Sequence, residues 1–177
     1  MLVSKDTALM VIDVQNGMFL EEYPIHEEER LLNRINLLLA KARESQIPVI
    51  YVQHNEELGT PLETHSPGWE IHSAVAPASQ DLVIQKYVPD SFHETNLQEE
   101  LTTRGINKLV LSGLQTDCCI DATSRRAVEL GYDVTVVKDA HSTCGQGSRT
   151  AAQIVDEYNQ SFAERVNLIE ASEIEFN

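Results

Sequence analysis

The sequence is poor in basic residues. Its 177 residues include 13 Lys and Arg against 28 Asp and Glu, which gives a formal net charge of -15 at neutral pH. Affinity for nucleic acid comes largely from Lys and Arg that neutralise phosphates, so nucleic acid and anionic membranes are excluded as expected partners. The acidic residues are spread over helix faces and the tail EASEIEF. This distribution is typical of a solvated surface, with a weak preference for cationic substrates.

Cysteines and long apolar runs are also scarce. Three cysteines, two of them adjacent, cannot form a disulfide framework and suit a reducing compartment. No segment reaches the roughly 20 apolar residues that a membrane-spanning helix needs. The first residues, MLVSKDTALMVID, have no basic region before their short apolar run, unlike a signal peptide. We therefore expect a cytoplasmic protein without membrane contact.

Short β-branched runs alternate with helical patterns along the whole chain. This alternation is typical of a parallel sheet covered by helices on both faces. We expect one domain over residues 1–177, an α/β protein with three α/β/α layers and a Rossmann-like, six-stranded parallel sheet. The expected strands are residues 8–13, 47–53, 82–86, 108–113, 133–137 and 166–170.

Four helices are expected between these strands. Apolar residues at helical spacing predict an amphipathic helix from about Glu27 to Ser45. A shorter helix contains Leu97 and Leu101, and the last two cover the segment from the cysteines to Leu130 and residues 148–164. Residues 54–81 have no period, and we expect a long loop there that acts as a lid or faces a partner. The alternative is an ordinary loop packed on Trp69.

Cys119 lies where an apolar strand gives way to a helix, and this position favours a nucleophile. Free N–H groups and the positive end of the helix dipole stabilise a thiolate there. Asp13 and Lys86 each end another expected strand, and ligands bind at the carboxyl edge of a parallel sheet. We expect Asp13 to act as the general base and Lys86 to offset negative charge. The alternatives are a buried structural cysteine and a surface lysine.

Backbone N–H groups in the turn before this helix are the expected oxyanion hole. Those of Leu114, Gln115 and Cys119 are the candidates, with Gln115 and Cys119 preferred. Cys118 precedes the nucleophile by one residue and cannot face the same pocket. We expect Cys119 to alkylate before Cys118, and Cys144 to be structural.

Three motifs resemble those of the isochorismatase-like cysteine hydrolases, which include nicotinamidases and N-carbamoylsarcosine amidase. The matching residues are Asp13, Gln15 and Phe19; Lys86, Ser91 and Phe92; and Gly113, Thr116 and Cys119, with Ile120 where Val is usual. The resemblance covers nearly the whole chain and selects Cys119 over Cys118. It also implies a cis peptide bond between Leu114 and Gln115 and a homo-oligomer, either a dimer or a tetramer.

One departure from the family concerns metal binding. Nicotinamidases carry an Asp-x-His metal motif after the second strand, whereas this chain reads Gln53-His54-Asn55, with no carboxylate two residues before His54. We expect neither a metal nor another cofactor. The residues expected to line the substrate pocket are Gln15, Phe19, His54, Trp69, His72, Ser91 and Phe92. For His54, Trp69 and His72, the alternative is a role in packing or in an interface.

The leading interpretation is a hydrolase that cleaves an amide, lactam or carbamoyl C–N bond of a small molecule through a thioester on Cys119. A vinyl ether would not require the cysteine, so a vinyl-ether hydrolase of the isochorismatase type is the second interpretation. A non-catalytic binding protein that kept the fold is the third. Thiol redox chemistry at Cys118 and Cys119 is the fourth, although adjacent cysteines form only a strained ring.

Overall fold

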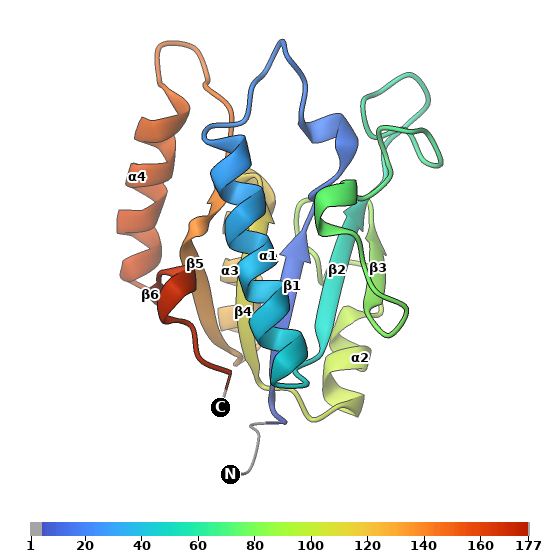
Figure 1. Ribbon diagram of the computed structural model, residues 1–177, viewed down its shortest axis with the longest axis vertical. Helices are drawn as coiled ribbons and strands as arrows, with labels where there is room; N and C mark the ends of the chain where they lie inside the picture. Colours follow the sequence, from blue (N-terminus) through green and yellow to red (C-terminus); the bar gives the residue numbers. More distant parts are fainter. Residues whose placement is uncertain (1–4, 177) are drawn as a thin grey trace.

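A parallel six-stranded sheet forms the centre of the protein. The computed structural model describes residues 5–176, and the strands follow one another across the sheet in the order β3-β2-β1-β4-β5-β6, every neighbouring pair being parallel (Figure 1). The strands are β1 Thr7–Ile12, β2 Val49–His54, β3 Leu82–Lys86, β4 Lys108–Leu114, β5 Asp133–Ser142 and β6 Asn167–Ile169. The expected α/β class and six-stranded parallel sheet are confirmed.

Helices cover both faces of the sheet, as expected. The four α-helices are α1 Glu28–Glu44, α2 Leu97–Thr103, α3 Asp121–Glu129 and α4 Ala151–Ala163. The buried side of α1 packs in one hydrophobic cluster with Leu9 and Val11 of β1. Residues of α2, α3 and α4 pack in the second cluster, with Met10 and Ile12. Alternate residues of β1 therefore point to opposite layers, which explains why this strand is apolar throughout.

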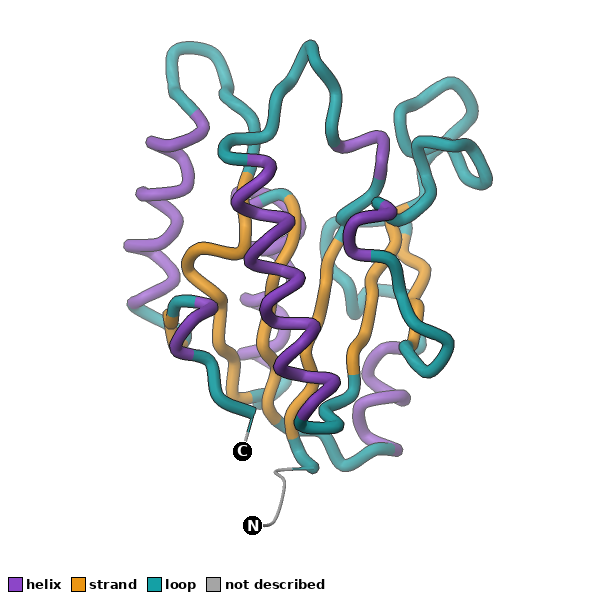
Figure 2. The backbone as a smooth tube through the Cα atoms, viewed as in Figure 1, coloured by secondary structure: helices purple, strands orange, loops and turns teal. Residues whose placement is uncertain are grey.

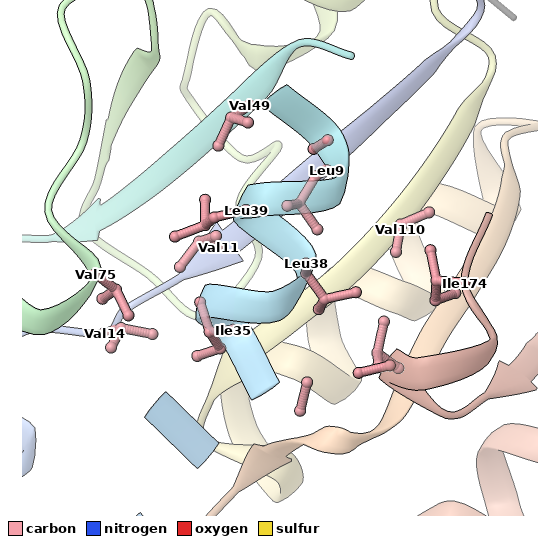
Figure 3. Packing of buried hydrophobic residues seen from close by; sticks show 14 of the residues in the cluster. Leu9, Val11, Val14, Ile35, Leu38, Leu39, Val49, Val75, Val110 and Ile174 are labelled. Atoms are coloured by element: carbon pink, nitrogen blue, oxygen red, sulfur yellow. The ribbon is translucent and has the colours of Figure 1, made fainter. Parts of the chain in front are cut away.

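The cluster under α1 shows why its sequence forms a helix there. Ile35, Leu38 and Leu39 lie between α1 and the sheet (Figure 3), and each is at most 1% exposed. Burying one such side chain stabilises the fold by about 1.5 to 3 kcal/mol. The three recur at helical spacing, so only a helix places them all on the sheet.

The structure departs from the expected elements in two places. The helix that contains the cysteines begins as a π-helical turn, Thr116–Ile120, before α3 starts at Asp121. β5 continues beyond residue 137 to Ser142, and the register shifts so that Gly113 pairs with His141. Single π-helical turns occur often at functional sites.

The arrowheads of β1 and β2, which are paired neighbours, lie at the carboxyl edge of the sheet (Figure 1), and loops rise from this edge (Figure 2). The expected long loop lies between β2 and β3 and contains one short 3-10 helix, Ser73–Val75. It is anchored near the end of β1 by backbone hydrogen bonds from Asn16 to Glu70, from Gly17 to Gly68 and from His72 to Val14. No helix within residues 5–176 is both long and apolar enough to cross a membrane.

Candidate active site

Asp13 and Cys119 lie between β1 and β4, where the order of the strands across the sheet reverses. The connection from β1 leads to β2 on one side, while β4 pairs with β1 on the other side. Asp13 follows β1 directly, and Cys119 lies in the turn after β4. Parallel α/β sheets bind ligands at such a switch point, outside the carboxyl ends of the strands.

Lys86 reaches this point from β3, although β2 lies between β3 and β1. Its Nζ atom is 2.8 Å from Asp13 Oδ2 and 3.3 Å from Cys119 Sγ. The exposed fractions are 1% for Asp13, 0% for Lys86 and 7% for Cys119. The structure thus brings the three expected catalytic residues together in a buried cluster.

The ammonium of Lys86 has two further neighbours at the ends of the strands. Its Nζ donates to the Val88 carbonyl oxygen at 3.1 Å and lies 3.1 Å from His54 Nδ1. Burial alone would lower the pKa of Lys86, but the negative charge of Asp13 and the hydrogen bonds with Asp13 and Cys119 outweigh burial and raise it. Lys86 therefore stays an ammonium and holds the triad together.

His54 is neutral beside this ammonium. Burial and then the charge of Lys86 lower the pKa of His54 below its usual value. Since an ammonium has only donors, His54 Nδ1 must accept, and the ring proton then sits on Nε2. Nε2 lies 3.9 Å from Glu56 Oε1. His54 is thus a direct contact of Lys86, in addition to the pocket role that we expected.

Asp13 has one oxygen to spare for proton transfer. Its Oδ2 pairs with Lys86, whereas Oδ1 is buried and has no hydrogen-bond partner among the described residues. Asp13 also has a positive φ of 53°, a left-handed conformation that Asp adopts more readily than most residues. An unpaired buried carboxylate oxygen is costly, and a proton would satisfy it.

The thiol of Cys119 is protonated in the resting site. A hydrogen bond with Cys118, burial and the negative charge of Asp13 raise the pKa of Cys119, and Lys86 opposes them. The two sulfur atoms are 3.9 Å apart. A thiolate forms only if the Cys119 proton passes to an acceptor, and the Asp13 carboxyl is buried in the same cluster and interacts with the Cys119 thiol.

Cys118 differs from its neighbour in both exposure and acidity. It is exposed, and the hydrogen bond with Cys119 lowers the pKa of Cys118 to about 7 although its partial burial opposes this. An exposed thiol with a low pKa reacts readily with alkylating agents. The structure therefore favours the reverse of the expected order of alkylation, and we now expect Cys118 to react first in the resting protein and Cys119 later.

The turn that carries the cysteines begins with a close approach of β4 to β1. Gly113 has a φ of 119°, and a Cβ atom there would lie 2.1 Å from the Ile12 carbonyl oxygen. No side chain fits at this position, which explains the glycine of the third motif. The peptide bond between Leu114 and Gln115, in the same turn, is cis, as the family resemblance implies.

Buried side chains clamp the same turn to β5. Thr116 Oγ1 lies 2.8 Å from His141 Nδ1, and His141 Nε2 lies 2.9 Å from Asn159 Oδ1 on α4. Thr143 Oγ1 donates to Asp117 Oδ1 at 2.7 Å. Burial lowers the pKa of His141 to about 4, so its ring is neutral and bridges the two partners. The sequence analysis missed His141, because only the extended β5 places it here.

Gln15 and the aromatic residues expected in the pocket are placed beside the long loop. Gln15 is fully buried, and its Nε2 donates to the carbonyl oxygens of His54 and Trp69, both at 2.9 Å. The rings of Phe19 and His72 lie 4.9 Å apart. The amide of Gln15 therefore joins the end of β1 to β2 and the loop. The side chains of Phe19, Trp69 and His72 are partly exposed.

Ser91 and Phe92 have structural partners on α3 and beyond. Ser91 is fully buried, with its Oγ 2.8 Å from Thr123 Oγ1. The Phe92 ring packs on Tyr132, which follows the carboxyl end of α3, whereas Cys119 precedes that helix. These two side chains dock the segment after β3 on α3, and Phe92 packs against the hydrophobic cluster that contains Cys119. Cys144, expected to be structural, is half-buried with its Sγ 3.7 Å from Gln115 Nε2.

The end of β2 does not fit the metal that nicotinamidases bind. Asn55 Nδ2 donates to Gln85 Oε1, Gln85 Nε2 donates to Gln53 Oε1, and Trp69 Nε1 donates to Asn55 Oδ1, at 2.7, 2.7 and 2.8 Å. These amides are neutral and already bonded to one another. Within residues 5–176, no three His, Cys, Asp or Glu side chains are grouped as metal ligands.

Comparison with known proteins gives consistent matches. The isochorismatase domain model matches residues 7–167. The isochorismatase family protein YddQ of Bacillus subtilis is 39% identical over 140 residues, which are 77% of this chain and 78% of YddQ. Streptothricin hydrolase of Streptomyces noursei is 36% identical over 136 residues, 77% of this chain and 49% of that protein, so the match spans about half of its length. A solved cysteine hydrolase of Pseudomonas syringae has a TM-score of 0.88 at 25% identity, over 96% of this chain and 90% of that one.

Proposed function

This chain belongs to the isochorismatase family of hydrolases, and we propose that it cleaves a C–N bond at an acyl carbon through a thioester on Cys119. The observation that supports this most is the position of Lys86 Nζ, 2.8 Å from Asp13 and 3.3 Å from Cys119 in a buried cluster. A thiolate adds to an acyl carbon, and a buried carboxylate next to a lysine is suited to take and return its proton. Small amides, lactams and ureido acids are the substrate class.

The reaction begins with transfer of the Cys119 proton to Asp13. The Cys119 sulfur then bonds to the acyl carbon, and the electron pair of the C=O bond moves to the oxygen. The backbone N–H groups of Gln115 and Cys119 are the proposed donors to this oxyanion, and removing one such donor typically costs about 10² to 10³ in rate. Among the described residues, the Gln115 N–H donates to no backbone acceptor.

Collapse of the oxyanion breaks the C–N bond. Asp13 gives its proton to the departing nitrogen, which leaves as an amine, and the acyl group remains on Cys119 as a thioester. Water then attacks the thioester while Asp13 takes a proton from it, and the carboxylic acid and the free thiol are released. Lys86 keeps its charge throughout and compensates first the carboxylate and then the thiolate.

The test is a panel of amides, lactams, ureido acids and nicotinamide, run with and without EDTA, with mass spectrometry of the quenched protein. We expect turnover of at least one C–N substrate, no effect of EDTA and an acyl adduct on the peptide that contains Cys119. Loss of activity on chelation would refute the metal-independent reaction. Turnover of isochorismate by the Cys119→Ala variant would instead support vinyl-ether hydrolysis, which needs no thiol.

A further inference from the structure

An open groove lies next to the buried triad. It has a volume of about 550 Å³ and is lined by His54, Asn55, Glu56, Glu57, Pro61 and Tyr87, among others. His54 connects it to the triad, because His54 Nδ1 is 3.1 Å from Lys86 Nζ, which is 3.3 Å from Cys119 Sγ. One side chain, that of His54, thus separates the groove from Lys86.

The groove has negative charge that nothing in it compensates. Glu56 and Glu57 are its carboxylates, and its lining includes no Lys or Arg. Among the ion pairs of the described residues, Glu56 is paired only with His54, which is neutral. In the same part of the chain, Glu57 is paired with no Lys or Arg. Lys86 does not offset this charge, because it is paired with Asp13 at 2.8 Å.

An exposed aromatic ring lies beside these carboxylates. Tyr87 directly follows Lys86 at the end of β3 and is 71% exposed. An ammonium or quaternary ammonium group binds over the face of such a ring, and a nearby carboxylate adds to the attraction. Carboxylates, an aromatic face and a contact through His54 to Lys86 therefore occur together in this groove.

We propose that this groove selects substrates that carry a positively charged ammonium group near the scissile bond. The inference names the substrate class of the proposed hydrolase and so rests on the proposed function for the reaction itself. The charge preference concerns access to Cys119 and can be measured without turnover. Glu56, Glu57 and Tyr87 are its specificity-determining residues.

The test compares three methanethiosulfonates that differ in charge: the cationic trimethylammonium-ethyl reagent, the anionic sulfonato-ethyl reagent and the neutral methyl reagent. In each case the thiolate attacks the thiosulfonate sulfur, forms a mixed disulfide and releases methanesulfinate. The reactions are run on the full chain with Cys118→Ser, because Cys118 is exposed. Mass mapping separates labelling at Cys119 from labelling at Cys144, and the neutral reagent corrects for changes in thiol reactivity.

We expect the cationic reagent to label Cys119 faster than the anionic one, with a ratio on the order of tenfold at low salt that falls as salt increases. Glu56→Gln with Glu57→Gln should lower the ratio several-fold, and Tyr87→Leu should slow only the cationic reagent. The control is Glu99→Gln on α2, which removes one carboxylate away from the groove and is compared with Glu56→Gln alone (Figure 1). It should leave the ratio unchanged.

Three results would overturn the proposal: equal cationic and anionic rates, a ratio that the double Glu variant does not change, or no labelling of Cys119 by any of the three reagents. Failure of the proposed function would look different. In that case neutral and cationic amides alike would give neither turnover nor an acyl adduct, while the labelling preference at Cys119 would persist.

Discussion

Replacing Asp13 by Asn should damage stability and activity together. The side chain keeps its size, but the buried ion pair with Lys86, at 2.8 Å and exposed fractions of 1% and 0%, loses its negative partner. Lys86 would remain a buried ammonium with His54 Nδ1 and the Val88 carbonyl as its neighbours. Removing one partner of a buried pair costs about 3 to 5 kcal/mol, which corresponds to a fall in Tm of roughly 6 to 20 °C for a domain of this size.

The same change should reduce turnover by about 10² to 10⁴, the usual range for a positioned general base. Calorimetry gives the stability, and turnover is measured well below the Tm of the variant so that unfolding does not contribute. The double variant Asp13→Asn/Lys86→Met separates the two effects, because it removes the unpaired ammonium. It should regain part of the lost stability and stay inactive. A single Asn variant with the Tm and the rate of the original protein would refute both the buried ion pair and the role of Asp13 as base.

Four further predictions follow from the site and its surroundings. Cys119→Ala should abolish turnover while Cys118→Ser keeps most of it, and comparable loss in both variants would contradict the assignment of the nucleophile. Brief treatment of the resting protein with iodoacetamide should label Cys118 before Cys119, as peptide mapping would show, because Cys118 is exposed with a pKa of about 7. The free energy of unfolding should fall by up to about 3 kcal/mol as the pH drops from 6.5 to 4. The reason is that the folded protein lowers the pKa of His141 from 6.5 to about 4, so the unfolded chain binds the proton first. In His141→Gln, urea unfolding across this range should lack that contribution. Light scattering at micromolar concentration should show a homo-oligomer, and a monomer would contradict the expectation taken from the family.

Periodicity and strand ends carried much of the information about the fold. Apolar residues at helical spacing predicted α1, because only one helical face packs on the sheet. The apolar runs predicted all six strands, since a parallel sheet covered on both faces is apolar throughout. The extension of β5 to His141 and Ser142 could not be predicted, because its later residues are polar and pair only through a shift in register with β4.

The sequence predicted side-chain contacts less well where the two partners are distant in the chain. Ser91 and Phe92 matched a motif, but their contacts with Thr123 and Tyr132 depend on how the segment after β3 docks on α3. The relative exposure of the two adjacent cysteines also depends on the fold. Position in the sequence says nothing about which thiol of a π-helical turn is buried.

The sequence by itself brought the three proposed catalytic residues to one edge of the sheet: Asp13 and Lys86 end two strands, Cys119 begins a helix after a third, and parallel strands present their carboxyl ends together. Only the tertiary structure decided how these groups are coupled. The order β3-β2-β1-β4 makes Lys86 cross the end of β2, where it contacts His54 before it reaches Asp13 and Cys119. Strand order, burial and charge pairing are properties of packed elements, so they set the acidity of these groups and the charge of the groove without any trace in local sequence.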